Sequence, residues 1–173
     1  MAHINMEIKA KCAHFGRIKN VLKKQKADFK GLDHQIDTYF RTNSGRLKLR
    51  EGNIENCLIY YEREDKESPK KSNVVLYKNE PDSSLKELLS KSLGVMAVVD
   101  KKREIYSIGN VKFHLDKVRD LGSFVEIEAI DAFGNMGKER LQQQCQFYVN
   151  LFKLREEDLV SCSYSDLLLH KKQ

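Results

Sequence analysis

The chain has 173 residues, of which 40% are hydrophobic and 9% aromatic, so it can bury a core and global disorder is excluded. Its 31 Lys and Arg against 25 Asp and Glu give a formal net charge of +6, which favours an anionic partner. The 4 cysteines form no CxxC pair, and no apolar run approaches the roughly 18 residues of a membrane span. We therefore expect a cytoplasmic protein without a zinc site, a disulfide framework or a membrane segment.

The first half of the chain predicts several short strands and one helix. Residues 6–11, MEIKAK, alternate apolar and charged side chains, as in a strand with two different faces. An amphipathic surface helix is predicted at 15–27, where Ile18, Val21 and Leu22 recur at helical spacing. Further strands are predicted at 34–40, 46–51, 57–63 and 74–77, with a turn at 42–45 and a polar loop at 64–72.

The second half predicts antiparallel hairpins followed by helices. A helix at 85–93 is expected to be capped by Ser83-Ser84 and to end before Gly94. Strands are predicted at 95–108, 111–118 and 123–130, a long helix at 136–152 and short helices within 156–169. The seven or eight strands indicate an α+β fold in a single domain, 1–173, whose residues 155–173 form a short C-terminal helical segment.

Several of these strands carry a row of charged side chains on one face, mostly opposite an apolar face, although Lys101 and Arg103 share theirs with Ile105. For any one strand this pattern is typical of a solvent-exposed face. If helices cover the apolar face of the sheet and the sheet closes into a barrel, however, the charged faces of the strands point into one central channel. Its charges would need an anionic ligand, metal ions or water to balance them. The charged parities are Glu7, Lys9 and Lys11; Arg46, Lys48 and Arg50; Lys101 and Arg103; Lys112, His114 and Asp116; and Glu126 and Glu128.

These residue types suit a metal–phosphate ligand. Lysines and arginines bind phosphate oxygens, and arginine can do so with two parallel hydrogen bonds. The candidate cations are Lys11, Lys48, Arg50, Lys101 and Arg103. Carboxylates are preferred ligands of Mg²⁺ and Mn²⁺, and the candidates are Glu7, Glu126 and Glu128.

An ordered set of motifs resembles the CYTH superfamily, also called the triphosphate tunnel metalloenzymes, and is most similar to class IV adenylyl cyclase (CyaB)-like bacterial proteins. From residue 6 to 168 the set is EIKAK, DTYF, GRLKLRE, LIYYER, KKREIY, the FHLD and GSFVEIE hairpin, and SYSDLL. The resemblance implies an eight-stranded antiparallel barrel, closed or nearly closed, with helices packed outside. It also implies a triphosphate bound within the barrel together with Mg²⁺ or Mn²⁺.

The resemblance assigns roles by matching position. Asp37 and Tyr39, on the DxY strand, are expected to act in positioning or packing. The expected metal ligands are Glu7, Asp116, Glu126 and Glu128. The expected phosphate-binding residues are Lys9, Lys11, Lys48, Arg50, Arg63, Lys101 and Arg103. The expected catalytic residues are Glu7, Lys11, Arg103 and Glu128.

The sequence departs from the family pattern at two places. The usual ExExK motif, matched at Glu7 and Lys11, has a glutamate where this chain has Lys9. A tunnel lysine expected near Tyr61 is replaced by Tyr61 or the later Arg63.

The resemblance leads to several hypotheses about activity. The first is cyclisation of ATP to cyclic AMP and pyrophosphate by a metal-dependent phosphorus–oxygen lyase. Alternatives are hydrolysis of inorganic triphosphate or thiamine triphosphate, and binding of a nucleotide or polyphosphate without catalysis. No nucleic-acid motif is present, so the expected partner is ATP or another triphosphate, and the sequence leaves a homodimer open.

Overall fold

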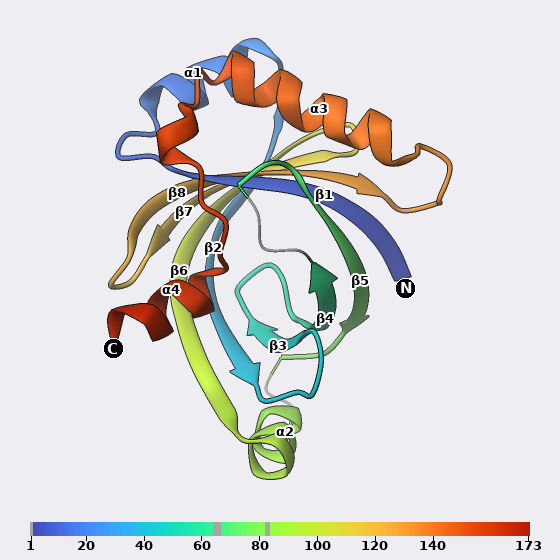
Figure 1. Ribbon diagram of the computed structural model, residues 1–173, viewed down its shortest axis with the longest axis vertical. Helices are drawn as coiled ribbons and strands as arrows, with labels where there is room; N and C mark the ends of the chain where they lie inside the picture. The colour runs from blue at the N-terminus through green and yellow to red at the C-terminus, as the bar shows by residue number, and fades with distance from the viewer. Residues whose placement is uncertain (1, 64–66, 82–83) are drawn as a thin grey trace.

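Eight strands of the described chain form one closed antiparallel barrel (Figure 1). The computed structural model describes residues 2–63, 67–81 and 84–173. Around the barrel the order is β1-β5-β4-β3-β2-β6-β7-β8. The strands are β1 (Ala2–Lys11), β2 (Asp28–Phe40), β3 (Arg46–Glu51), β4 (Cys57–Arg63), β5 (Lys70–Lys78), β6 (Val95–Ile108), β7 (Val111–Val118) and β8 (Gly122–Asp131). The predicted α+β fold, an eight-stranded antiparallel barrel with helices outside, is confirmed.

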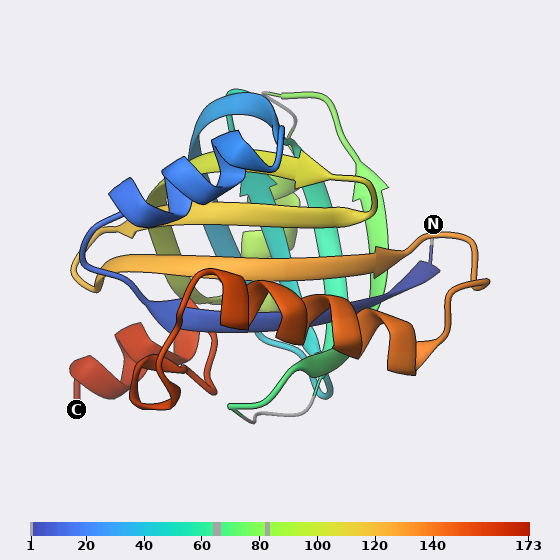
Figure 2. The ribbon, with the colours of Figure 1, turned by 90° about the horizontal axis from the view of Figure 1, so that it is seen from above.

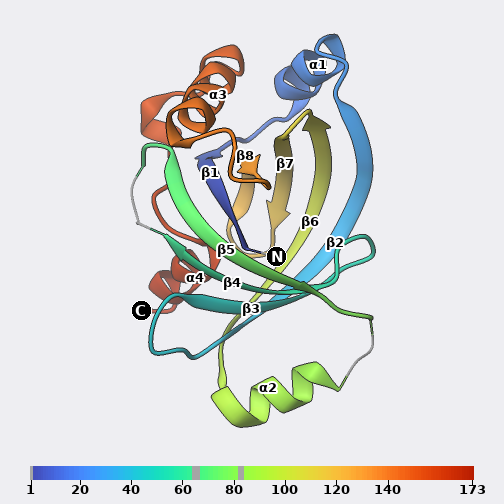
Figure 3. The same cartoon turned by 90° about the vertical axis from the view of Figure 1, so that its right-hand side faces the viewer.

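The helices lie outside the barrel wall or across its end. In chain order they are α1 (Gly16–Lys24), α2 (Leu85–Leu93), α3 (Lys138–Leu151), the 3-10 helix η1 (Glu156–Asp158) and α4 (Tyr164–Lys171). Figure 2 shows α1 and α3 lying over β1, β7 and β8, while Figure 3 shows α2 apart from them, beyond β2 and β3. In the described part of the chain, every helix is too short or too polar to cross a bilayer.

The main hydrophobic core lies between the barrel wall and helices α1 and α3. β1 contributes Met6, Ile8 and Ala10, and β7 and β8 contribute the apolar residues of their matching parity. Each fully buried aliphatic or aromatic side chain of this kind contributes about 1.5–3 kcal/mol to stability. Alternate side chains of a strand point to opposite faces. The charged residues of these strands therefore point into the barrel. The apolar face was therefore correctly predicted as the one the helices cover.

Three strands begin at least four residues earlier than the sequence pattern predicted, and the first of them, β1, begins at Ala2 because it pairs with β5 from there. β2 begins at Asp28, six residues before the predicted start, because its first half pairs with the long strand β6. β5 begins at Lys70, so the predicted loop was wrong at 70–72, and residues 64–66 of that loop lie outside the described residues. The reason is tertiary: β5 pairs with β1 from Lys70 onward, and the Lys70 side chain is fully buried.

The ends of α2 agree only partly with the predicted caps. Ser84 occupies the N-cap position, but its side chain makes no capping hydrogen bond, and Ser83 lies outside the described residues. Gly94 ends the helix with φ +77°, a left-handed conformation that glycine adopts without steric cost.

The C-terminal segment 159–166 lies across one end of the barrel. Beyond Glu7, β1 has no partner in β5, and there Leu159 bridges to Ala10 while the Val160 amide donates to the Lys9 carbonyl at 2.9 Å. The Lys70 ammonium donates to the carbonyls of Val160 (3.0 Å) and Ser161 (2.7 Å). Burial lowers the pKa of Lys70 to about 8. These contacts fix the segment over the end of β1 that follows Lys9.

Candidate functional site

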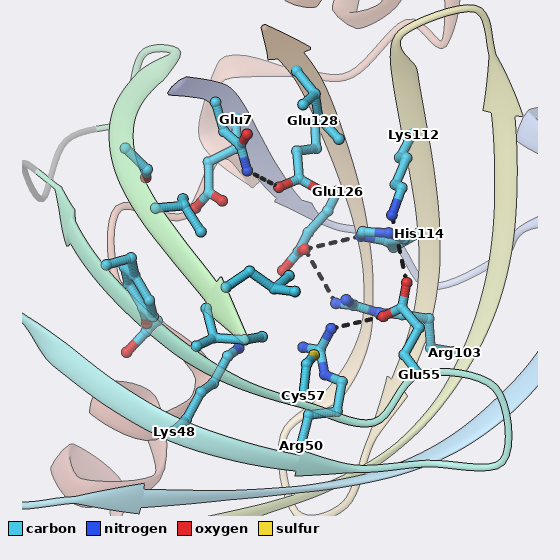
Figure 4. Close-up of a pocket in the computed structure, with 18 of the residues that line it drawn as sticks. Glu7, Lys48, Arg50, Glu55, Cys57, Arg103, Lys112, His114, Glu126 and Glu128 are labelled. Atoms are coloured by element: carbon cyan, nitrogen blue, oxygen red, sulfur yellow. Dashed lines mark hydrogen bonds and ion pairs between the residues drawn. The ribbon is translucent and has the colours of Figure 1, made fainter. Parts of the chain in front are cut away.

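A cavity of about 520 Å³ lies inside the barrel and is lined by the inward-facing side chains of its strands (Figure 4). This volume falls in the roughly 300–1,000 Å³ range of small-molecule sites. Nine of the residues predicted for the site line it: Glu7, Lys9, Lys48, Arg50, Arg63, Lys101, Arg103, Glu126 and Glu128. Lys11 and Asp116 do not line it.

An inner cluster of Asp37, Lys48, Arg50 and Lys101 forms on the neighbouring strands β2, β3 and β6. Arg50 donates to both Asp37 oxygens at 2.9 Å, and Lys101 and Lys48 donate to Asp37 Oδ2 at 2.7 and 3.0 Å. Burial alone would raise the pKa of the Asp37 carboxyl, but Arg50, Lys101 and Lys48 hold it well below its ordinary value. One carboxylate therefore orders three cations that face the cavity, in agreement with the positioning role expected for Asp37.

Arg103 connects two further carboxylates. It donates to both oxygens of Asp116 at 2.7 and 2.6 Å and to Glu126 Oε2 at 3.1 Å. Asp116 is fully buried and also accepts from the Tyr164 hydroxyl at 2.6 Å. In this position Asp116 orients Arg103 from behind the cavity wall.

Glu126 is neutralised by several partners. Its Oε1 lies 3.3 Å from Lys9 Nζ, and its Oε2 lies 3.3 Å from His114 Nδ1 in addition to its bond with Arg103. Burial would raise the pKa of Glu126, but Arg103 and Lys9 hold it well below its ordinary value.

The inward positions of β1 are Asn5, Glu7 and Lys9. Lys9 is buried, lies 3.9 Å from the centre of the Tyr164 ring, and has a pKa lowered by burial. Lys11 is exposed at the end of the strand, outside the cavity. The expected acid–x–acid–x–lysine pattern therefore fits the inward side chains when it is moved back by two residues. In that corrected register Lys9 is the lysine, and the departure from the pattern is Asn5.

An outer corner of Asn5, Glu7, Ser72 and Glu128 gathers oxygen atoms from β1, β5 and β8. Glu7 stands directly opposite Glu128, and Asn5 is paired in register with Ser72. The Asn5 amide nitrogen donates to Glu128, and Arg63 donates to Glu7. Asn5 Oδ1 and Ser72 Oγ are buried without a hydrogen-bond partner in the described chain. Two carboxylates beside orphaned neutral oxygens fit a hard divalent cation such as Mg²⁺ or Mn²⁺.

Glu55 is a cavity residue that the sequence interpretation missed. It comes from the loop between β3 and β4, where its Oε2 accepts from Arg50 Nη1 at 2.9 Å and its Oε1 lies 3.5 Å from Lys112 Nζ. Burial would raise its pKa, but Arg50 and Lys112 hold the carboxyl well below its ordinary value. An acid in an aperiodic loop carries no parity signal, so nothing in the sequence pattern could have identified it.

An apolar wall of Ile59, Val74, Leu76 and Ile130 lines part of the cavity. Along β1, Lys9 lies at the end covered by the C-terminal segment, and Glu7, Asn5 and His3 follow in that order towards the other end. On the neighbouring strand β5, Val74 of the apolar wall is paired with His3. Leu76 continues past the end of β1, and Ile130 lies one inward step beyond Glu128. The apolar wall therefore extends from the outer corner towards the end of the cavity away from the C-terminal segment.

Comparisons with known proteins agree with this architecture. A family model described as "CYTH domain" matches residues 3–161. Among the solved structures that are similar to the chain, three align along almost its whole length. The PH1012 protein of Pyrococcus horikoshii OT3 is 26% identical, with a TM-score of 0.79, and the match covers 94% of this chain and 98% of that one.

A putative adenylate cyclase of Vibrio parahaemolyticus is 18% identical, with a TM-score of 0.78 and coverage of 98% and 99% of the two chains. HpAC1 of Hippeastrum, described as a putative adenylyl cyclase with a dominant triphosphatase activity, is 10% identical, with a TM-score of 0.62 and coverage of 98% and 95%. At these identities both show the shared fold alone. A comparison with curated proteins gave no match.

Proposed function

The chain belongs to the CYTH domain family, and on this premise we propose that it is a metal-dependent enzyme that converts ATP to cyclic AMP and pyrophosphate. The family's enzymes include cyclases and triphosphatases, so the proposal has two parts: a triphosphate binds inside the barrel, and the reaction takes place at the α-phosphorus.

The proposal rests on the order of chemical groups along the cavity. Cations lie towards the covered end, where the ammonium nitrogens of Lys9 and Lys101 are 3.9 and 6.0 Å from the centre of the Tyr164 ring. Glu7 and Glu128 of the outer corner come next, and the apolar wall follows. A nucleoside triphosphate has the same order, with an anionic chain, a reacting α-phosphate and an organic group. A purely inorganic triphosphate would leave the apolar wall without a partner.

The chain's own cations would hold the phosphate oxygens. Arg50 and Arg103 are fixed on their carboxylate partners, so they are already oriented and lose little freedom on binding. Lys48 and Lys101 share one carboxylate, Asp37, and their positive charge exceeds that of their partner. These groups stabilise the charge that develops on departing pyrophosphate.

Glu7 and Glu128 would hold the divalent cation. When bound there, Mg²⁺ or Mn²⁺ would neutralise phosphate charge and lower the pKa of the attacking ribose hydroxyl. The apolar wall would exclude water from the organic end of the ligand and so favour attack by the ribose 3′-hydroxyl over attack by water.

The test is incubation of the purified protein with ATP, inorganic triphosphate and thiamine triphosphate, each with Mg²⁺ or Mn²⁺. We expect cyclic AMP and pyrophosphate in equal amounts from ATP. If orthophosphate is released from inorganic or thiamine triphosphate and no cyclic AMP forms, the protein is a hydrolase and the cyclase proposal is wrong. Tight phosphate binding without product under either metal would identify a non-catalytic binder.

A further inference from the structure

Asn5 is a buried polar residue whose hydrogen-bonding capacity is only half used. Its side chain lines the cavity and is 4% exposed, its nitrogen donates to Glu128, and its Oδ1 has no partner among the described residues. Ser72, its cross-strand neighbour, is 2% exposed and its Oγ is equally without a partner. A buried polar atom left without a partner costs about 1–3 kcal/mol, so two in one corner indicate a ligand that satisfies them.

The charges of the same corner indicate that this ligand is a cation. Glu7 and Glu128 stand directly opposite each other, where two like charges destabilise a sheet. Arg63 compensates Glu7, but Glu128 makes no ion pair with any described residue and has only the Asn5 amide as a hydrogen-bond donor. The corner therefore combines an uncompensated carboxylate with neutral oxygen atoms.

The remaining cavity carboxylates are not available for a second cation. Glu126 is bound by Lys9, Arg103 and His114, and Glu55 is bound by Arg50 and Lys112. In the described chain no cluster of three or more His, Cys, Asp or Glu residues could hold a metal ion. A cation site here consequently depends on neutral ligands as well as carboxylates.

We propose that Asn5 Oδ1 is a ligand of one divalent cation, held together with Glu7 and Glu128, and that the Asn5 amide nitrogen orients Glu128 at the same time. This inference rests on the proposed metal-dependent function and adds a ligand and a stoichiometry to it. One Mg²⁺ or Mn²⁺ binds per chain, because the corner supplies two carboxylates and the other acids are compensated. An amide oxygen is an ordinary ligand for such hard cations.

The experiment is titration of the full chain with Mn²⁺ in the absence of nucleotide, followed by electron paramagnetic resonance of free Mn²⁺ and by calorimetry. The wild type is expected to bind one Mn²⁺. Asn5→Leu removes the oxygen at similar size and should weaken Mn²⁺ binding at least tenfold. Asn5→Asp replaces the amide by a carboxylate and should strengthen it at least tenfold. Thermal unfolding without metal checks that each variant is folded.

Two matched controls separate ligation from general effects. His3→Asp adds the same charge two residues away on the inward face of β1 and should strengthen Mn²⁺ binding much less than Asn5→Asp. Asn73→Leu makes the same change as Asn5→Leu at an exposed position of β5 and should have no effect. If Asn5→Leu does not fold, the comparison of Asn5→Asp with His3→Asp still decides the matter.

The inference is overturned if Asn5→Leu binds Mn²⁺ like the wild type, if Asn5→Asp gains no more than His3→Asp, or if the wild type binds two ions or none. These results are distinct from failure of the proposed function, which is measured by cyclic AMP. A wild type that binds one Mn²⁺ through Asn5 but forms no cyclic AMP would support this inference and reject the cyclase.

Discussion

The inner cluster and the outer corner are built in the same way but differ in how their charges are compensated. Both consist of inward side chains on adjacent strands of the barrel. In the inner cluster every charge has a partner, since Asp37 accepts from Arg50, Lys48 and Lys101. In the outer corner Glu128 has no cationic partner in the described chain, and Asn5 Oδ1 and Ser72 Oγ lack any partner.

This difference distinguishes groups that stabilise the fold from groups that are available to bind a ligand. Compensated charges can be buried stably and give a fixed scaffold with a net positive charge. Uncompensated groups carry a cost that a ligand can relieve. The comparison therefore predicts that changes in the inner cluster affect stability first, whereas changes in the outer corner affect binding and turnover first.

Asp37→Asn should have the largest effect, because it removes the carboxylate that Arg50, Lys48 and Lys101 share and that is the ion-pair partner of both lysines in the described chain. We expect a loss of about 3–5 kcal/mol in the free energy of unfolding, measured by urea denaturation. Inorganic triphosphate should restore part of this stability by supplying the missing negative charge. Asp28→Asn, at an exposed residue 3.5 Å from Lys30, is the control and should have almost no effect. If Asp37→Asn lowers the free energy of unfolding by less than about 1 kcal/mol, the inner cluster does not stabilise the fold and does not differ from the outer corner in this respect.

Glu128→Gln should act in the opposite sense. It keeps the shape of the side chain and an oxygen that can accept from the Asn5 amide but removes the uncompensated charge, so the fold should be at least as stable as the wild type. Metal-dependent turnover should fall by about 100-fold or more, at or above the loss seen when a metal site's supporting residues are changed. Product formation and urea denaturation are measured on the same preparation. Normal turnover would mean that the cation binds elsewhere.

Glu55→Gln should sharpen the comparison by freeing the cations around it. The Glu55 carboxylate occupies a place beside Arg50 and Lys112 that a phosphate oxygen could take. Because this pair is partly exposed, its removal should change binding by only about 1 kcal/mol. We expect inorganic triphosphate to bind about fivefold more tightly by calorimetry. The control is Glu51→Gln, because Glu51 pairs with Lys86 outside the cavity. Weaker binding of inorganic triphosphate by Glu55→Gln than by the wild type would contradict the role given to Glu55.

The smallest effect concerns the proton on Lys101. Burial lowers the pKa of this ammonium to about 7, although Asp37 opposes the shift, while Arg50, Arg103 and Lys48 lower the pKa further. Free Lys101 is then mostly neutral at pH 8, and bound phosphate oxygens favour its charged form. Triphosphate binding at this pH should take up roughly one proton, and affinity should fall as the pH rises above about 7.

Calorimetry in buffers of different ionisation enthalpy measures this uptake. The Lys101→Met variant lacks the titrating group, so both the uptake and this part of the pH dependence should disappear. Unchanged proton uptake in the variant would assign the titration to another group.

The sequence predicts the inward residues better than their pairing. Lys48, Arg50, Arg103 and Glu128 were identified because alternation along a strand is a local pattern that survives folding. The same pattern could not decide which lysine of β1 occupies the cavity, because Lys9 and Lys11 share one parity. Only the closing of the barrel end by the C-terminal segment, which leaves Lys11 outside, settles that point.

Other features were outside the reach of sequence patterns for different reasons. Lys70 is fully buried in a strand but follows a polar loop, and its partners are carbonyls 90 residues away. Asn5 shares the parity of Glu7, yet an uncharged side chain does not stand out as a site residue. Its importance follows from an unsatisfied atom, which only the three-dimensional contacts reveal.

The most direct test of the account is a crystal structure of the protein with Mn²⁺ and a non-hydrolysable ATP analogue. The account predicts an anomalous Mn²⁺ peak at Asn5, Glu7 and Glu128, a triphosphate chain among Arg50, Lys101 and Arg103, and the organic group against the apolar wall. A nucleotide and metal bound on the outside of the barrel, with the cavity holding only water, would contradict it.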